Sequence, residues 1–239
     1  MSGLAMMFLL ASGCAEPTKA GGCPDGGTWA GNPDYDFFNH NWSCDPAAIS
    51  VPFDLDAESF FTTLSIKQSD IRQELDDVVA VWNAAGADIT LTVGDTALRG
   101  GVVDQPDGKS QIFMSPHGKP FGGDATVATT YDWHFLSETT KSCDMAVWST
   151  HSGVLLSGWT GPEFDYIVNG DADDTERIDM TDLLTHELGH CIGFDHNLNG
   201  PIYDATPTVS VMRSGQDVGV EFAGLSTDDI AALIFVYGT

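Results

Sequence analysis

Residues 185–196 read THELGHCIGFDH and contain three of the seven histidines of this 239-residue chain. In a helix, His186 and His190 lie one turn apart on the same face, a spacing that suits two ligands of one metal ion. Gly193 permits a left-handed backbone, so the chain can leave the helix sharply and carry His196 back as a third ligand. Three histidines leave one tetrahedral position for water, which is typical of a catalytic zinc rather than a structural one.

Glu187 follows the first of these histidines and is expected to act as the general base of a zinc hydrolase. The alternative is that the two helix histidines are satisfied by hydrogen bonds in the core and bind no metal. A chance match to the two histidines and Glu187 alone is a real risk, but requiring Gly193 and His196 as well makes it rare. The segment therefore predicts one catalytic Zn²⁺ held by His186, His190 and His196, with Glu187 as the base.

Three helices are predicted from apolar residues at helical spacing. The first lies within residues 65–86, the second ends near Gly193 and begins at Asp179 or Thr181, and the third begins at Ser226, where Asp229 completes a variant of the capping box. Their expected buried faces are, in chain order, Ile71, Leu75, Val78, Val79 and Trp82; Leu183, Leu184, Leu188 and Ile192; and Ile230, Leu233, Ile234 and Tyr237.

Three segments have the alternating or β-branched composition of strands: DITLTVG at 88–94, ATVATTY at 125–131 and CDMAVWS at 143–149. Gly- and Pro-rich loops separate them. The length favours a single domain, which we place at residues 51–239. The fold class expected from this mixture of strands and helices is α+β.

The formal net charge of −26 excludes nucleic acid as a favourable partner, because a polyanion would be repelled. Most of the acidic residues are aspartate, which suits turns, helix caps and oxygen-ligand sites, so Ca²⁺ is considered as a second cation. The acidic stretch NGDADD at 169–174 lacks the spacing and the glutamate of a helix–loop–helix calcium loop.

The N-terminus has an apolar run, residues 4–11, that is too short to span a bilayer and fits the core of an export signal. Small residues before Cys14 resemble a bacterial lipoprotein signal. We therefore expect residues 1–13 to be a signal peptide, Cys14 to be lipidated, and residues 14–50 to form a flexible tether. The protein would be an outer-membrane or cell-surface lipoprotein that touches the membrane only through its anchor; plain secretion is the alternative.

Without Cys14 the chain has four cysteines, which can form two disulfides in an oxidising compartment. We expect Cys143 to pair with Cys191, because Cys143 begins a strand and Cys191 lies between two zinc ligands. Cys23 and Cys44 would form the other pair. Four cysteines allow three connectivities, and a free, buried Cys191 is a further alternative.

The segment from His186 to His196 resembles the metzincin metalloprotease signature H-E-x-x-H-x-x-G-x-x-H at every specified position. Metzincins also carry a methionine in a tight turn below the zinc, and SVMRSG supplies Met212 sixteen residues after His196. The stretches GFDH and LSTDDIAALIFVYG are similar to those of the matrixin branch. The resemblance covers about residues 50–239.

This resemblance implies a twisted mixed sheet packed on two long helices, followed by a small C-terminal subdomain with the Met-turn and a final helix. It also implies a zinc endopeptidase, expected as a monomer, whose protein or peptide substrate lies extended along an edge strand near residues 125–130. Matrixins bind a second, structural zinc partly through HGD, but Lys119 replaces that aspartate here, so no second zinc is expected. The alternative functions are an inactive metzincin-fold surface binding protein or a calcium-binding adhesin.

Overall fold

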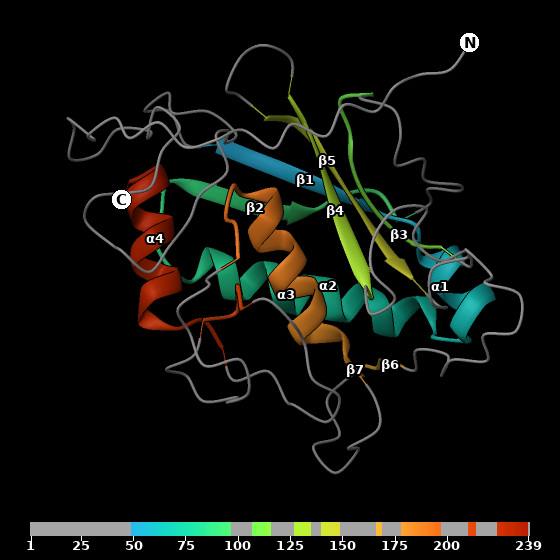
Figure 1. Cartoon of the computed structure of the whole chain (residues 1–239). Helices are drawn as coiled ribbons and strands as arrows, with labels where there is room; N and C mark the ends of the chain where they lie inside the picture. The colour runs from blue at the N-terminus through green and yellow to red at the C-terminus, as the bar shows by residue number, and fades with distance from the viewer. Residues whose placement is uncertain are drawn as a thin grey trace, which may run out of the picture.

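A five-stranded mixed β-sheet forms the centre of the fold (Figure 1). The computed structural model describes residues 49–96, 107–115, 127–134, 140–148, 166–168, 178–196, 210–213 and 224–238. The strands are β1 (Ile49–Leu55), β2 (Ile89–Val93), β3 (Ser110–Ser115), β4 (Ala128–His134) and β5 (Thr140–Trp148), in the spatial order β2-β1-β3-β5-β4. Neighbouring strands are parallel except β4, which runs antiparallel to β5 at one edge.

In the described part of the chain, four helices accompany the sheet: α1 (Ala57–Leu64), α2 (Gln68–Asn83), α3 (Met180–Cys191) and α4 (Thr227–Tyr237). A short parallel pair, β6 (Tyr166–Ile167) and β7 (Ile178–Asp179), precedes α3. Helices α2 and α3 pack against each other on the same side of the sheet, where α3 contacts β4 and β5 (Figure 1). The two helices and the sheet share one hydrophobic core.

Helix α2 forms where the apolar spacing predicts it, and the five residues of its expected face are buried. The helix ends at Asn83, whose side-chain amide accepts a hydrogen bond from the Leu91 N–H and donates one to the Leu91 carbonyl, both at 2.8 Å. Gly86 follows with a positive φ of 80°, which is the left-handed turn expected there. The helix is thereby tied to β2, the strand that follows it.

Helix α4 begins as predicted, since Ser226 and Asp229 form a capping box. Its predicted buried face is partly wrong: Leu233 and Tyr237 are buried, whereas Ile230 and Ile234 are only half-buried. Asp229 is fully buried and accepts hydrogen bonds from residues outside the helix. Helical neighbours on one face are three or four residues apart. The face that buries the Asp229 carboxylate therefore also buries Ala232 and Val236.

The predicted strands at 88–94 and 143–149 are present as β2 and β5, and the segment 125–131 contributes the first part of β4. The expected α+β class is therefore confirmed at the level of a mixed sheet with packed helices. Strand β1 begins at Ile49, and the domain boundary at 50/51 stays a prediction. The predicted signal peptide, the predicted tether, Cys14, Cys23 and Cys44 lie outside the described residues. Within the described ranges, no helix is long and apolar enough to span a membrane.

Candidate metal centre

Helix α3 supplies the first part of the centre and is almost entirely buried. The side chain of Asp179 caps it by accepting a hydrogen bond from the Thr181 N–H at 2.8 Å, so Asp179 rather than Thr181 is the cap. The Trp82 indole N–H of α2 donates to the Thr185 carbonyl at 3.1 Å. These contacts fix the position of the helix directly before the histidine motif.

The three histidines of the motif converge as predicted. His186 and His190 lie one turn apart with ring centroids 4.7 Å apart, and Gly193, with a φ of 102°, turns the chain so that the His196 ring lies 4.8 Å from His190 and 5.2 Å from His186. One nitrogen from each ring lies within 4.8 Å of the others. The three side chains form a cluster that could hold a metal ion.

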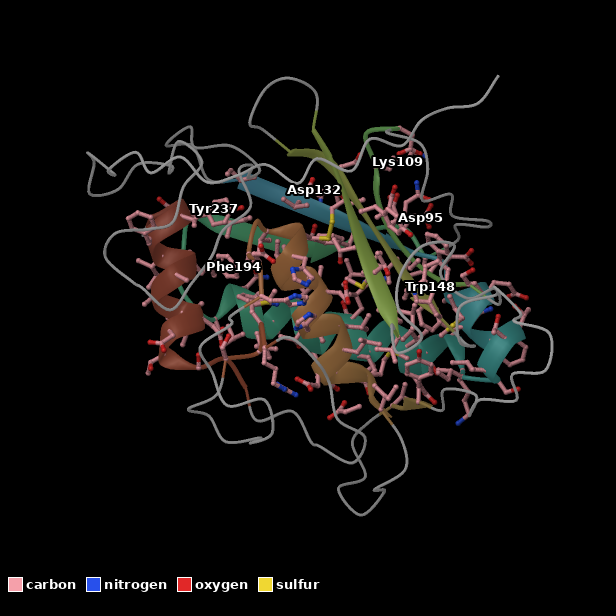
Figure 2. The ribbon with its side chains drawn as sticks, in the orientation of Figure 1. Asp95, Lys109, Asp132, Trp148, Phe194 and Tyr237 are labelled. Atoms are coloured by element: carbon pink, nitrogen blue, oxygen red, sulfur yellow. A yellow bond between two sulfur atoms is a disulfide. The ribbon has the colours of Figure 1, made fainter. Side chains whose placement is uncertain are left out.

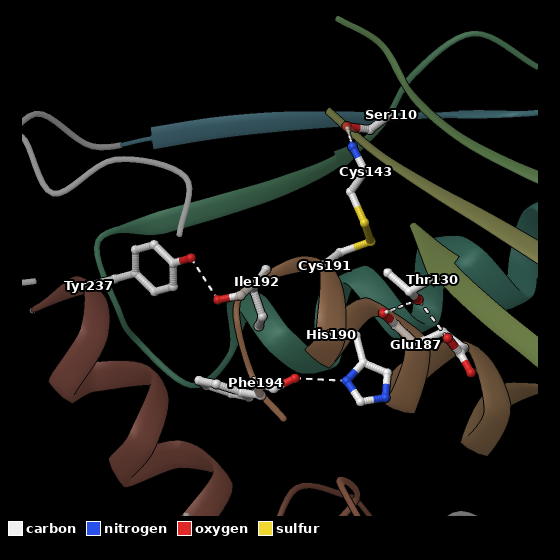
Figure 3. Close-up of a disulfide and its surroundings, with 9 residues drawn as sticks. All are labelled: Ser110, Thr130, Cys143, Glu187, His190, Cys191, Ile192, Phe194 and Tyr237. Carbon is white, nitrogen blue, oxygen red and sulfur yellow. Dashed lines mark hydrogen bonds between the residues drawn. A yellow bond between two sulfur atoms is a disulfide. The ribbon is translucent and has the colours of Figure 1, made fainter. Parts of the chain in front are cut away.

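Hydrogen bonds orient the two helix histidines. His186 Nδ1 lies 2.7 Å from the Val211 carbonyl, and His190 Nδ1 lies 2.7 Å from the Phe194 carbonyl (Figure 3). A carbonyl oxygen only accepts, so each Nδ1 carries the proton and each neutral ring keeps its lone pair on Nε2. His190 Nε2 and His196 Nε2 are 3.2 Å apart. The lone pairs are thus available for a cation at the centre of the cluster.

The three imidazoles favour their neutral forms. Burial lowers the pKa of His186 well below its usual 6.5, and His190 lowers it further, against the hydrogen bond to Val211. Burial also lowers the pKa of His190 and of His196, and His190 adds to the effect on His196. Neutral imidazole is the form that binds a metal ion, because protonation removes the lone pair.

Glu187 is buried beside His186, and its carboxylate Oε2 lies 2.5 Å from the Thr130 hydroxyl of β4 (Figure 3). The same hydroxyl lies 3.1 Å from the Glu187 carbonyl. The sequence predicts Glu187 as a functional residue but does not predict Thr130, because 57 residues separate the two and only the packing of β4 on α3 brings them together.

Met212 is fully buried and packs against α3 at Gly189. A Cβ atom on Gly189 would clash with the Met212 sulfur and come within 3.2 Å of the Trp82 ring, so the glycine permits this close approach. The Met212 N–H donates to the Ser210 hydroxyl at 3.0 Å, which makes the segment 210–213 a tight turn. The methionine therefore packs against the helix that carries His186 and His190, and its role as a Met-turn stays a prediction.

Two buried carboxylates hold the segment 210–213. Asp229 of α4 accepts from the Ser210 hydroxyl at 2.7 Å and from the Val211 N–H at 3.1 Å. Asp182 of α3 forms a buried ion pair with Arg213. Burial raises the pKa of Asp182 to about 6, although the positive charge of Arg213 acts to lower it. Neither of these two contacts is predicted from the sequence. The capping box at Asp229 is a local signal, but it does not reveal that the same carboxylate also reaches a turn 18 residues away.

A disulfide between Cys143 and Cys191 joins β5 to the end of α3, with the two Cα atoms 5.6 Å apart (Figure 3). The predicted pairing is confirmed, and the alternative of a free Cys191 is wrong. The Tyr237 hydroxyl of α4 donates to the Ile192 carbonyl at 2.7 Å, and the side chains of Phe194 and Tyr237 lie between α3 and α4 (Figure 2). The turn that leads to His196 is therefore held from two sides.

Comparison with known protein families gave no family that matches this chain. Comparison with curated proteins likewise gave no match. The function is therefore inferred from the geometry and chemistry of the centre itself.

Proposed function

We propose that this chain is a zinc-dependent endopeptidase of the metzincin type, similar to matrixins, in which Glu187 is the general base. The observation that carries the proposal is the convergence of His186, His190 and His196 around one point, with the Glu187 carboxylate on the same helix. Met212 below the helix agrees with this assignment. A core histidine pair without a metal would not account for a third imidazole held at the same point.

The cluster suits zinc in its donor atoms and spacing. Zinc–nitrogen bonds of about 2.0–2.1 Å at tetrahedral angles separate two ligand nitrogens by about 3.3 Å. The 3.2 Å between His190 Nε2 and His196 Nε2 agrees with this value. The Nδ1 hydrogen bonds to backbone carbonyls are the outer contacts that metal-binding histidines usually make. Three imidazoles without a carboxylate or thiolate favour zinc over calcium.

Zinc bound here would lower the pKa of a coordinated water and polarise the carbonyl of the scissile peptide. Glu187 accepts the proton of the attacking water and delivers it to the leaving amine, which is the role of a general base that then acts as an acid. Glu187 is buried and its charge acts on the pKa of His196, which supports a carboxylate near the cluster that is not itself a ligand. The chain thus supplies both the metal ligands and the proton carrier.

The substrate is proposed to bind along β4, which is the last strand of the described sheet and has no further strand beside it there. An extended peptide can pair with the backbone of such an edge, and this pairing reads little side-chain sequence. Thr130 of the same strand contacts Glu187, so a peptide on β4 would pass close to the general base. This placement supports a protein or peptide as the substrate.

Export, lipidation of Cys14, a tether over residues 14–50 and a monomeric state remain part of the proposal. The alternative of an inactive binding protein is disfavoured by Glu187, because a protein without catalysis needs no base at that position. Among the described residues, the metal-binding cluster consists of histidines alone, so that part of the chain offers no basis for a calcium-binding adhesin.

The proposal predicts that purified protein hydrolyses casein, loses the activity with a zinc chelator and regains it with Zn²⁺. Glu187→Gln is expected to keep zinc bound and to lower the rate by a factor of about 10² to 10⁴, since it removes proton transfer and no ligand. His186→Ala is expected to lose zinc and activity together, because it removes one of three ligands. Measured zinc content and initial rates check both variants.

Two results would contradict the assignment. A Glu187→Gln protein that retains more than about a tenth of the wild-type rate would exclude the general-base role. Equal loss of zinc in Glu187→Gln and His186→Ala would mean that Glu187 is a ligand or a folding residue.

A further inference from the structure

We propose that Thr130 is a positioning residue that holds the Glu187 carboxylate in its working orientation. The inference rests on the proposed function, and it concerns a residue that the metal-binding motif does not contain. The carboxylate and the hydroxyl come from different layers of the fold, α3 and the edge strand β4. The contact is therefore a property of the assembled fold.

The chemistry of the contact selects one of two acceptors. The Thr130 hydroxyl has a single proton and faces the Glu187 carbonyl at 3.1 Å and its carboxylate at 2.5 Å. A charged acceptor at the shorter distance makes the stronger bond, so the proton points to the carboxylate. One carboxylate oxygen is then engaged by Thr130, and the rotation of the side chain is restricted.

The strand that carries Thr130 is firmly placed. Thr130 pairs with Met145 of β5, which is fully buried, and the disulfide from Cys143 joins the same strand β5 to α3. The hydroxyl is thus held relative to α3 by the sheet as well as by its own hydrogen bond. A base carried by a long, rotatable side chain gains from such a fixed donor, because misplacement of a catalytic group lowers the rate.

A threonine is needed for this role because it is both small and a donor. Valine has nearly the same shape without the hydroxyl, so Thr130→Val removes the hydrogen bond and leaves the packing of β4 nearly unchanged. Serine keeps the hydroxyl. These two substitutions separate the hydrogen bond from the volume of the side chain.

The fold contains a second threonine–carboxylate pair that serves as a matched control. The Thr181 hydroxyl of α3 donates to Glu74 of α2, also at 2.5 Å, and Glu74 is buried. This pair joins two helices and lies at the start of α3, away from the histidine motif. Thr181→Val therefore removes the same kind of bond from the same helix without touching the general base.

The experiment compares zinc-loaded wild-type protein with Thr130→Val, Thr130→Ser and Thr181→Val. Outer contacts of this kind typically contribute about 10- to 100-fold, so kcat of Thr130→Val is expected to fall by that factor while KM stays within about twofold and zinc content is unchanged. Thr130→Ser should recover most of the activity. Thr181→Val should lower thermal stability and leave kcat unchanged. A crystal structure of Thr130→Val should show the Glu187 side chain in a different rotamer.

The crystal structure of Thr130→Val tests the positioning role of Thr130 independently of the proposed hydrolysis. If the wild type shows no chelator-sensitive hydrolysis, the endopeptidase proposal fails, while a displaced Glu187 in Thr130→Val would still support the positioning role. An unmoved Glu187 with a wild-type kcat would overturn it. An equal loss of kcat in Thr130→Val and Thr181→Val would also overturn it, because both would then act only through stability.

Discussion

His190 and His186 lie one turn apart on α3 and make hydrogen bonds of the same length, 2.7 Å, to backbone carbonyls, yet the chain builds the two bonds differently. The partner of His190 is Phe194, four residues later in the same turn. The partner of His186 is Val211, 25 residues away. The candidate centre thus has a local part, which the motif contains, and a remote part, which depends on other elements of the fold.

The remote part is held by two buried carboxylates. Asp229 of α4 binds Ser210 and Val211, and Asp182 of α3 binds Arg213. The Val211 carbonyl can orient His186 only while this segment stays in place. Substitutions that displace α4 should therefore weaken metal binding through His186. Substitutions that displace the end of α3 should weaken it through His190 and His196.

The largest effect is expected for Asp229→Asn, which breaks the remote part. The carboxylate is fully buried and accepts from Ser210, Val211 and the Ser226 N–H, and an amide NH₂ would face some of these donors without accepting. Loss of charged hydrogen bonds in a buried network costs about 3–5 kcal/mol. Urea unfolding should show this loss, and zinc titration should show weaker binding.

The control for this prediction is Asp228→Asn, the same change at the exposed neighbouring position in the first turn of α4. It should change neither stability nor zinc affinity appreciably. Asp229→Asn with wild-type zinc affinity would show that the segment 210–213 does not support the metal site, and the division into two parts would be wrong.

A smaller effect is expected when the disulfide that ends at Cys191, within the local part, is removed. Cys143→Ala with Cys191→Ala opens a link between residues 48 positions apart, and native disulfides of this kind contribute about 2–4 kcal/mol. Zinc affinity should fall less than in Asp229→Asn, because the Phe194 carbonyl that orients His190 remains close by in sequence. Thermal unfolding and zinc titration of the double variant check this ranking, which the reverse order of zinc affinities would contradict.

The same division explains which features the sequence predicts. The histidine cluster, Gly193, the cap at Asp179 and the capping box at Ser226 all follow from spacings of a few residues, and each is present in the structure. Four cysteines allow three connectivities. The predicted strand at Cys143 and the predicted helix at Cys191 favoured the pairing that the structure contains.

Apart from the disulfide, the sequence does not predict the long-range contacts of the centre. Thr130 meets Glu187 only because the register of β4 on β5 turns its hydroxyl towards α3. Asp229 meets the segment 210–213 only because α4 turns the face that carries Asp229 towards it, and this orientation leaves Ile230 and Ile234 half-buried, where burial was predicted. Both depend on how separate elements pack, which no local spacing encodes.

The smallest effect concerns acid, and it sharpens the comparison between the two parts. Because the folded-state pKa values of the three histidines lie below 6.5, the unfolded chain takes up protons first as the pH falls, so the stability of metal-free protein should decrease below about pH 6.5. Asp182 acts in the opposite direction, since its raised pKa favours proton uptake by the folded state, but it is one group against three. His186 is the most buried of the three rings and its pKa lies below 6.5, so it should stay neutral to a lower pH than His190 and His196. NMR titration of the imidazole protons in metal-free protein, with thermal unfolding at each pH, measures this order. If His186 takes up its proton before the other two, the segment that carries Val211 does not shield it from water as the structure indicates. The remote part of the centre would then be accessible to solvent.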